Sequence, residues 1–307
     1  MKVLVTGGAG FVGANLVRNL LAHGDEVVVI DDLSTGYLSN IADLDIEFIE
    51  GSILNDSLLT KATRGVDSVV HLAAIPSVPR SVAAPLPSHE ANATGTLKVL
   101  EAVRNSSGHV LLASSSSVYG NNPTLPKHEE LRPMPISPYA VSKLAAESYA
   151  LAWQATYGIK ALPFRFFNVF GPLQAANHAY AAVLPSFLDA IHKGQSVKVY
   201  GDGTQTRDFT YVGDVVNVLT TAVHEQKCAP TPVNLAFGTR RSLNDVLQDL
   251  ATVLQRDFQI DFLEPRIGDV KDSQADSSKL LELFGALTPT NFQQALQATA
   301  DFIFGNL

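Results

Sequence analysis

The stretch TGGAGFVG at residues 6–13 decides the fold of this chain. An apolar run, KVLVT (2–6), leads into it. GANLVRNLLAHG (13–24) follows, with apolar residues spaced near 3.6 and a glycine at its end. The pattern predicts a buried strand, a tight glycine turn and an α-helix. Glycines in such a turn let the backbone approach an anionic group, to which the helix start offers free N–H groups and a positive dipole end.

An acidic residue stands at the end of the next predicted strand, EVVVID (26–31). After a glycine turn of this kind, an acid in that place is suited to bond the ribose hydroxyls of a dinucleotide. Asp31 and Asp32 would repel a 2′-phosphate, and DDLSTG (31–36) contains no Arg or Lys to bind one. The sequence therefore predicts a site for NAD in preference to NADP. A glycine-rich turn without a ligand is the alternative.

Composition narrows the class of protein. The chain has 307 residues, enough for one large or two smaller domains, and its net charge of −8 argues against broad nucleic-acid binding. Cys228 is the only cysteine, which excludes an internal disulfide and suits a reducing compartment. We find no apolar window of about 18 residues and no signal-peptide pattern at the start. We expect a cytoplasmic enzyme without membrane contact.

Short apolar runs alternate with helical patterns through the first half of the chain. This alternation predicts a doubly wound parallel sheet covered on both faces, a Rossmann-type α/β fold. Strands are expected at 2–6, 26–31, 45–51, 68–74, 109–115 and 159–168, and helices at 13–24, 56–63, 90–105 and 138–156.

The pattern changes after residue 168, where prolines and shorter elements follow. Helices are expected at 180–193, 214–224 and 242–255, and strands at 196–200, 208–212 and 232–235. A last amphipathic stretch lies at 291–304. We expect an NAD-binding Rossmann domain over 1–167, completed by about 208–237. A smaller C-terminal α/β substrate domain is expected over 168–207 and 238–307.

A tyrosine and a lysine lie four residues apart in SPYAVSK (137–143). Ser137 is a good helix cap and Pro138 suits the first turn, so Tyr139 and Lys143 are expected on one helix face. An ammonium group near a phenol stabilises the phenolate and lowers the pKa below about 10. Such a tyrosine can accept a proton at neutral pH. An ordinary exposed pair is the alternative when this spacing stands alone.

Nine motifs along the chain carry a resemblance to a known family. They are TGGAGFVG, DDLSTG, HLAA, NATGTLKVLEA, SSSSVYG, SPYAVSK, RFFNVFGP, GDGTQTRDFTYVGD and PRIGDV. Their order resembles the extended short-chain dehydrogenase/reductases, in the NAD-dependent epimerase/dehydratase group that acts on nucleotide sugars. The resemblance implies a recycled, tightly bound NAD, a UDP-sugar substrate and a C-terminal nucleotide-sugar-binding domain. It also implies a homodimer packed through helices at about 90–105 and 139–156.

The serine run in SSSSVYG bears on the reaction. The resemblance implies that Ser115 hydrogen-bonds the sugar O4, and that Tyr139 and Lys143 complete the catalytic set. Family dehydratases carry acids at the next two positions and decarboxylases carry a glutamate, whereas this chain has Ser116 and Ser117. Serine is not a general acid near neutral pH, so the resemblance favours a 4-epimerase that oxidises C4 reversibly and returns the hydride to the other face. Tyr119 and His71 are interpreted as structural.

The resemblance also implies binding roles for other positions. Phe166 would flank the nicotinamide, Arg207 and Arg266 would clamp the diphosphate, and Asp269 would accept from the uridine ribose. Cofactor contacts are expected from Gly7, Gly10, Phe11, Val12, Asp31, Asp32, Ser34, Thr35, Gly36, Ser52, Ile53, Leu72, Ala73, Ala74, Tyr139, Lys143 and Phe166. Substrate contacts are expected from Ser77, Arg80, Ser115, Ser116, Tyr139, Asn168, Ala182, Val183, Val199, Tyr200, Arg207, Arg266, Asp269 and Ser273.

The identity of the sugar rests on few positions. SVPRS (77–81) resembles epimerases that accept N-acetylated UDP-hexoses, and Ser273 stands where a bulky aromatic would restrict the pocket to glucose and galactose. We therefore expect UDP-GlcNAc/UDP-GalNAc, with or without UDP-glucose/UDP-galactose. UDP-glucuronate remains an alternative. Leu173 and Ala175 stand where many relatives carry Arg and Asp, so this loop does not decide between the sugars.

Two further classes stay open at this stage. A nucleotide-sugar dehydratase or 4-ketoreductase would share most of these motifs, and a ketoreductase would consume NAD(P)H. A non-catalytic NAD-sensing protein is disfavoured because Ser115, Tyr139 and Lys143 are all present. The eight histidines are scattered and show no i,i+4 pair, so no metal is expected.

Overall fold

The chain forms two compact units in a computed structural model that describes residues 1–176, 181–265 and 271–305. The first unit comprises 1–122, 129–166 and 216–234, and the second comprises 123–128, 167–215 and 235–307. Within the described ranges, no helix is long and apolar enough to cross a membrane.

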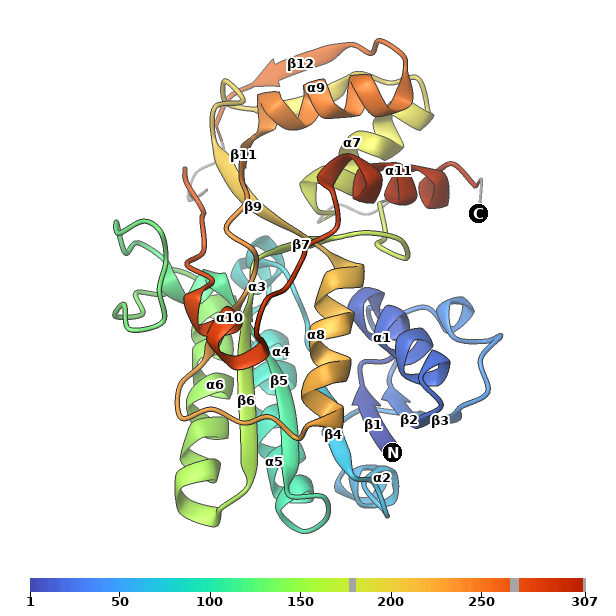
Figure 1. The fold of residues 1–307 in the computed structure, drawn as a ribbon, viewed down its shortest axis with the longest axis vertical. Helices are drawn as coiled ribbons and strands as arrows, with labels where there is room; N and C mark the ends of the chain where they lie inside the picture. Colours follow the sequence, from blue (N-terminus) through green and yellow to red (C-terminus); the bar gives the residue numbers. More distant parts are fainter. Residues whose placement is uncertain (177–180, 266–270, 306–307) are drawn as a thin grey trace. The chain divides into compact units, whose positions relative to one another are not determined.

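The first unit is built on a seven-stranded sheet in the order β10-β6-β5-β4-β1-β2-β3 (Figure 1). Six of its strands pair in parallel, as the near-continuous apolar runs predict. The strands are β1 (Lys2–Thr6), β2 (Glu26–Asp31), β3 (Glu47–Glu50), β4 (Ser68–His71), β5 (His109–Ser115), β6 (Lys160–Phe166) and β10 (Val233–Leu235). The order reverses between β1 and β4, which is where such sheets bind ligands.

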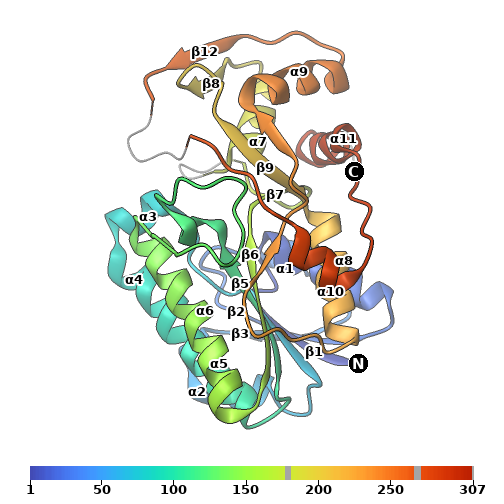
Figure 2. The same ribbon diagram turned by 60° about the vertical axis from the view of Figure 1, so that its left-hand side comes forward.

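Helices cover both faces of this sheet (Figure 2). Helices α2 (Asp56–Ala62), α5 (Gly95–Arg104) and α6 (Pro138–Tyr157) pack side by side on one face, over a core that includes Leu4, Val69 and Leu112. On the other face lie α1 (Phe11–Ala22) and α8 (Val212–His224), where Asn19 hydrogen-bonds Asn217 and Thr220. Apolar side chains point both ways from β1, so each face is buried.

The segment before α5 is more complex than the single helix expected over 90–105. Short helices α3 (Val78–Ala83) and α4 (Pro85–His89) precede it, and Glu90–Thr94 forms a π-helical turn that continues into α5. Such turns occur often at functional sites and re-aim the side chains that they carry. Here the π-helical turn directs Asn92 into the protein, where its side chain is buried.

The second unit has two small sheets with helices packed on a separate core. One sheet has the order β11-β9-β7 and the other pairs β12 with β8. Its strands are β7 (Asn168–Phe170), β8 (Val197–Tyr200), β9 (Thr206–Tyr211), β11 (Arg240–Ser242) and β12 (Ile260–Leu263). Its helices are α7 (Val183–His192), α9 (Leu243–Leu254), α10 (Ser278–Phe284) and α11 (Phe292–Ile303).

Several expected boundaries were wrong. The strand expected over 159–168 is too long, because β6 ends at Phe166 and Asn168 already begins β7, which belongs to a different sheet. The segment expected to complete the first domain, 208–237, is also too long. Only residues 216–234 belong to the first unit, because β9 pairs with β7 and β11 of the second unit. The expected strand over 68–74 ends at His71, and α1 begins at Phe11 rather than at Gly13. β12 was not expected, since its four side chains are all exposed and give no alternating pattern.

Helix α1 approaches the glycine turn closely at Gly13. A Cβ added to Gly13 would lie 2.1 Å from the Gly7 carbonyl oxygen and 2.7 Å from the Gly8 Cα. Real side-chain carbons cannot come that near backbone atoms, so only glycine allows α1 to start where it does.

We therefore predict that Gly13→Ala lowers the free energy of unfolding by about 2 kcal/mol, because the turn and α1 must move apart. The measurement is urea unfolding followed by the fluorescence of Trp153, the single tryptophan, which lies in the first unit. Ala22→Ser, at the exposed end of the same helix, is the control and should change stability by less than about 0.5 kcal/mol. Equal stabilities for the two variants would refute the close approach.

Candidate active site

The carboxyl ends of four parallel strands bring the predicted cofactor and catalytic residues to one edge of the sheet. Thr6 at the end of β1 pairs with Ile30 of β2 and with His71 of β4. The glycine turn, Asp31 and residues 72–74 therefore leave the sheet side by side, and Ser115 leaves it at the end of β5. This edge of the first unit is the candidate active site.

The glycine turn leaves room and a positive end for an anion. Gly7 has φ +72°, and a Cβ there would lie 2.7 Å from the amide nitrogen of Ala73, so this residue must be glycine. Gly10 precedes α1 without any side-chain cap, and the first turn, which begins with Phe11 and Val12, contains no acid. The N–H groups at the start of α1 thus keep their capacity to bind a phosphate.

Asp31 has a second role that sequence reasoning missed. Its buried carboxylate accepts the Ala9 N–H at 2.9 Å and the Leu33 N–H at 2.8 Å. Burial raises the pKa of Asp31, and the two amide hydrogen bonds oppose that rise. Asp31 therefore fixes the glycine turn to β2. Asp32 is exposed and accepts the Ser34 N–H at 3.0 Å.

The other expected cofactor residues belong to the first unit and stay predictions as contacts. Ser34 and Thr35 are exposed, and Gly36 is buried against Ala9. Ile53 is buried below the π-helical turn, where its side chain meets Gly95. The remaining positions are half-buried: Ser52 after β3, Leu72, Ala73 and Ala74 after β4, and Phe166 at the end of β6.

The hydroxyl of Ser115 has a defined direction. Its Oγ accepts from the Ser117 N–H at 3.1 Å and from the Ser117 hydroxyl at 2.9 Å. Because both acceptor positions are used, the proton of Ser115 is left for Tyr139, to which it hydrogen-bonds. Ser117 is therefore an orienting residue, a role the sequence reasoning missed. Ser116 is half-buried beside them.

The expectation that Lys143 lowers the pKa of Tyr139 was wrong for this structure. Burial raises the pKa of Tyr139, and only the hydrogen bond with Ser115 opposes it. The Lys143 Nζ donates instead to the Ala113 carbonyl of β5 at 2.9 Å. Burial lowers the pKa of Lys143 from 10.5 to about 8. Helical spacing placed the two residues on one helix but could not show where the ammonium group points.

A chain of buried hydrogen bonds holds the backbone of Tyr139. Its N–H donates to the Ser81 hydroxyl at 3.0 Å, and its carbonyl accepts the Ser142 hydroxyl at 2.8 Å. The Ser142 Oγ in turn accepts from the Asn92 Nδ2 at 3.0 Å. The start of α6 is thus bonded to α3 and to the π-helical turn.

The same chain continues to the end of β1. The Thr96 hydroxyl donates to the backbone carbonyl of Asn92 at 2.6 Å. The His71 ring then connects Thr96 to Thr6, with its Nε2 3.0 Å from the Thr96 hydroxyl and its Nδ1 2.7 Å from the Thr6 hydroxyl. Burial and the nearby Lys143 ammonium lower the pKa of His71 to about 3, so this histidine is neutral. In the sequence, the motifs HLAA and NATGT contain His71, Asn92 and Thr96 of this hydrogen-bond chain, and neither motif reveals which side chains bond to each other.

Ser77 adopts an unusual backbone conformation at the start of α3, the helix whose Ser81 bonds to the Tyr139 N–H. Its φ of +100° lies in a region that L-residues rarely occupy, and its hydroxyl caps α3 by accepting the Arg80 N–H at 3.3 Å. Strain of this kind gathers at functional sites. Ser77 and Arg80 are both half-buried, and their contacts with a substrate stay predictions.

The remaining expected substrate residues belong to the second unit. Asn168 is in β7, Ala182 and Val183 begin α7, and Tyr200 ends β8. Val199 is fully buried in the core of that unit, so only its backbone could contact a ligand. Arg266 and Asp269 lie outside the described residues.

Arg207 of β9 and Ser273 come together at the Thr206 carbonyl. The Arg207 Nη1 donates to the carbonyls of Thr206 at 2.8 Å and Lys271 at 3.3 Å, and the Ser273 N–H donates to the Thr206 carbonyl at 3.1 Å. Next to Arg207, the buried Asp208 accepts the Ala275 N–H at 2.9 Å. Burial raises the pKa of Asp208 to about 7. These bonds fix the segment that carries Ser273.

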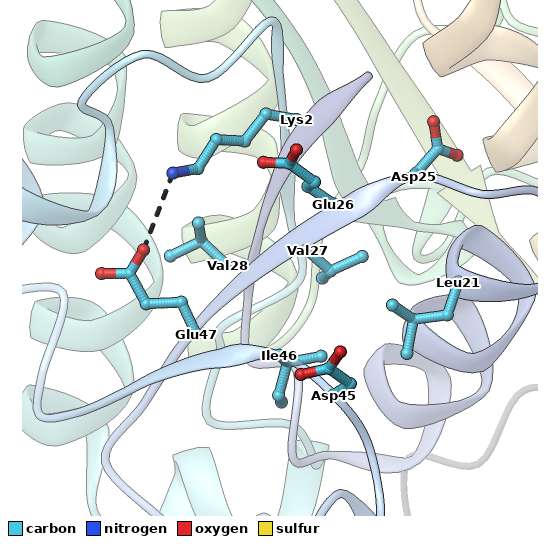
Figure 3. A pocket seen from close by; sticks show the side chains of 9 residues that line it. All are labelled: Lys2, Leu21, Asp25, Glu26, Val27, Val28, Asp45, Ile46 and Glu47. Carbon is cyan, nitrogen blue, oxygen red and sulfur yellow. Dashed lines mark ion pairs between the residues drawn. The ribbon is translucent and has the colours of Figure 1, made fainter.

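A cavity of about 510 Å³ lies elsewhere in the structure (Figure 3). Lys2, Glu26 and Glu47 line it, and the Lys2 Nζ lies 3.7 Å from the Glu47 Oε2. These residues are at the amino ends of β1, β2 and β3, opposite to the glycine turn. The cavity therefore contains no candidate catalytic group. Among the residues with described positions, no group of three His, Cys, Asp or Glu could hold a metal ion.

Comparison with known proteins gives consistent matches. The model of the NAD dependent epimerase/dehydratase family matches residues 3–236. UDP-glucose 4-epimerase from Mycolicibacterium smegmatis is 33% identical over 309 residues, which cover 98% of each chain.

Two solved structures extend these matches. UDP-N-acetylglucosamine 4-epimerase from Methanobrevibacter ruminantium M1, in complex with UDP-N-acetylmuramic acid, has a TM-score of 0.94 and 35% identity, covering 100% of this chain and 99% of that one. UDP-glucuronic acid 4-epimerase from Bacillus cereus, in complex with UDP-glucuronic acid and NAD, has a TM-score of 0.90 and 31% identity over 100% of both.

The buried Lys143 predicts a pH-dependent stability. Its pKa is about 8 when folded and near 10.5 when unfolded, so between these values the unfolded chain binds more protons and stability rises with pH. At pH 7 Lys143→Met removes the cost of burying the ammonium group but also removes its hydrogen bond to Ala113. The net effect should be an increase of about 2 kcal/mol in the free energy of unfolding, and this increase should vanish above about pH 10.

Urea unfolding at several pH values, on protein purified without bound nucleotide, is the measurement. Lys61→Met, on the exposed face of α2, is the control and should show no such gain. A gain for Lys143→Met that does not change with pH would contradict the assigned cost of burying the ammonium group.

Proposed function

Because this chain belongs to the NAD-dependent epimerase/dehydratase family, we propose that it is an NAD-dependent UDP-sugar 4-epimerase. The observation that carries the proposal is the group formed by Ser115, Tyr139 and Lys143 at the carboxyl edge of the sheet, next to the glycine turn. Serines rather than acids follow Ser115, which favours reversible oxidation at C4 over elimination of water.

The residues present fit NAD. Gly7 must be glycine because a Cβ there would meet the Ala73 backbone, and this lets the turn lie tightly at the start of α1. Helix α1 begins without a side-chain cap, and Asp31 and Asp32 at the end of β2 have no Arg or Lys beside them in DDLSTG. Gly7, Gly10 and Asp31 would hold the cofactor. When bound, NAD supplies a hydride acceptor and, in its reduced form, a hydride donor.

The chain's own residues would move the proton. Tyr139 would accept the proton of the sugar C4 hydroxyl and later return it. Ser115, oriented by Ser117, would donate to the phenolate or to the sugar O4. Burial keeps Tyr139 protonated in the structure. The Lys143 ammonium would therefore turn from the Ala113 carbonyl toward the phenol to favour the phenolate.

We propose UDP-GlcNAc/UDP-GalNAc as the preferred substrates, with or without UDP-glucose/UDP-galactose. Support comes from Ser273, whose small side chain leaves room for an N-acetyl group, and from a matching UDP-N-acetylglucosamine 4-epimerase. UDP-glucuronate is the second candidate, because a UDP-glucuronic acid 4-epimerase matches over the full chain. The single cysteine suits a reducing compartment, so we place the enzyme in the cytoplasm.

We also propose a homodimer through α5 and α6. Val141 is 53% exposed, Tyr149 38% and Tyr157 46%, and these three apolar side chains lie along α6. Tyr149, Trp153 and Tyr157 form a series of edge-on ring contacts, with ring centroids 5.8 and 5.2 Å apart. Exposed aromatic side chains in such a series are typical of the centre of a protein interface.

The function predicts that the purified enzyme, without added cofactor, interconverts UDP-GlcNAc and UDP-GalNAc. Each of UDP-GlcNAc, UDP-glucose and UDP-glucuronate is incubated in turn and followed by proton NMR of the anomeric region. Tyr139→Phe should reduce turnover about a thousandfold, because the proton acceptor is lost. Ser273→Tyr should reduce turnover of UDP-GlcNAc while sparing UDP-glucose, since only the N-acetyl group needs the space.

Conversion of none of the three sugars would defeat the 4-epimerase proposal. Conversion of UDP-glucuronate alone would support the second candidate. Full activity of Tyr139→Phe would exclude the assigned role of that residue.

The homodimer predicts that the wild-type protein sediments at twice the monomer mass at micromolar concentration. Tyr149→Arg should shift it to the monomer mass, because the interface would bury a charge in place of an aromatic ring. Lys193→Glu, at the exposed C-cap of α7 in the second unit, is the control and should leave the dimer intact. Monomeric wild-type protein would contradict the proposal.

A further inference from the structure

A buried ion pair lies one helical turn beyond the candidate catalytic lysine. The Glu147 Oε1 accepts from the Arg165 Nη2 at 2.7 Å, and the Glu147 Oε2 accepts from the Arg165 Nε at 3.0 Å. Both side chains are almost fully buried: Arg165 is 3% exposed and Glu147 is 4% exposed. Two parallel hydrogen bonds of this kind fix orientation as well as distance.

The pair joins three elements at the level of the active site. Glu147 is on α6, Arg165 is on β6, and the Ser114 hydroxyl of β5 donates to the Glu147 Oε2 at 2.8 Å. Ser114 lies opposite Arg165 in the β5–β6 register, and the next residue, Ser115, lies opposite Phe166. Residues 113, 114 and 115 therefore contact Lys143, Glu147 and Tyr139 in turn.

Two further contacts fix the guanidinium of Arg165. Its guanidinium lies 4.7 Å from the centre of the Tyr119 ring, and its Nη1 donates to the Glu129 carbonyl at 3.4 Å. The Tyr119 hydroxyl donates to the Asn234 side chain at 2.7 Å. Arg165 thus cannot follow α6 if the helix moves, and the ion pair sets the position of the helix on the sheet.

The charge of Glu147 also concerns Lys143. Residues four apart on a helix are neighbours, so an unpaired Glu147 carboxylate would attract the Lys143 ammonium away from the Ala113 carbonyl. Arg165 neutralises this carboxylate, and Lys143 bonds to Ala113 instead. Breaking a buried pair leaves one uncompensated charge, whose effect on a neighbouring group is large at low dielectric.

We propose that the Glu147–Arg165 ion pair is a positioning device for the catalytic helix. It holds α6 in register with β5, and it keeps the carboxylate of Glu147 from capturing Lys143. Neither residue touches the reacting atoms in this assignment. The inference rests on the proposed 4-epimerase function, in which Tyr139 and Lys143 handle the proton.

Other titratable groups on the elements packed against α6 do not compete with this pair for Lys143. His71 of β4 is neutral, and Tyr119 of the turn after β5 bonds to Asn234. His89 of α4 and Glu90 of the π-helical turn are exposed, and Arg80 of α3 is half-buried. On α5, Lys98 pairs with Asp56, and Arg104 pairs with Glu101.

The test compares charge variants of opposite sign. Glu147→Gln leaves an unbalanced guanidinium, so the pKa of Lys143 should fall by about one pH unit, whereas Arg165→Met leaves an unbalanced carboxylate and should raise it by about as much. The Lys143 pKa is read by NMR titration of ¹³C-labelled lysine in the protein without substrate, with the signal assigned through Lys143→Met. The pH profile of kcat should shift in the same two directions.

The double variant Glu147→Gln/Arg165→Met separates charge from position. Its Lys143 pKa should return toward the wild-type value, while kcat stays about tenfold lower and KM changes less than twofold. Arg165→Lys keeps the charge without the bidentate geometry and should behave like the double variant. Asp56→Asn, which removes the exposed ion pair with Lys98 in the same unit, is the control and should shift neither pH profile nor kcat.

Shifts of the same sign in the two single variants, or no shift, would overturn the proposal. Should the single variants fail to fold, the neutral double variant decides, because full kcat in it would also overturn the proposal. The lysine titration needs no substrate. Its outcome is therefore distinct from a failure of the 4-epimerase function, which the sugar panel and Tyr139→Phe test.

Discussion

Helix α6 carries a buried ammonium and a buried carboxylate on the face that packs on the sheet, and neither can stay there without a partner. The two strands beneath supply the partners. From β5, the Ala113 carbonyl accepts from Lys143 and the Ser114 hydroxyl donates to Glu147, and from β6 the guanidinium of Arg165 pairs with Glu147. The placement of Tyr139 follows from these bonds, because the tyrosine begins the same helix. The site is therefore held by satisfied buried polar groups more than by apolar contact.

The hydrogen bonds around Tyr139 suit a reaction that runs in both directions. An epimerase must remove a proton and return it, so its base cannot be fixed permanently in either form. Burial favours the phenol, and the Ser115 hydroxyl favours the phenolate. Lys143, with a pKa near 8, is itself close to the point where it can lose or keep its proton. Small movements within this group could change which form dominates.

The sequence predicted what depends on period and order, namely the parallel sheet, the glycine turn and the helix that begins at Ser137. It could not predict what depends on side-chain direction in three dimensions. The bond from Lys143 to Ala113 and the orienting role of Ser117 are examples. Tertiary pairing also decided that β6 would end at Phe166 and that β7 would begin at Asn168 in another sheet, since apolar residues continue on both sides of the break. The network through Asn92 depends on a π-helical turn, which has no clear sequence signal.

The carboxylate of Asp31 has consequences for how cofactor preference could evolve or be engineered. It is the acceptor for the Ala9 amide inside the glycine turn, besides being the residue expected to select against a 2′-phosphate. A change to a cation at this position would leave the Ala9 amide without its acceptor. The choice between NAD and NADP and the conformation of the glycine turn therefore depend on the same side chain. A shift toward the phosphorylated cofactor would have to begin at the exposed neighbour, Asp32, or supply a substitute acceptor first.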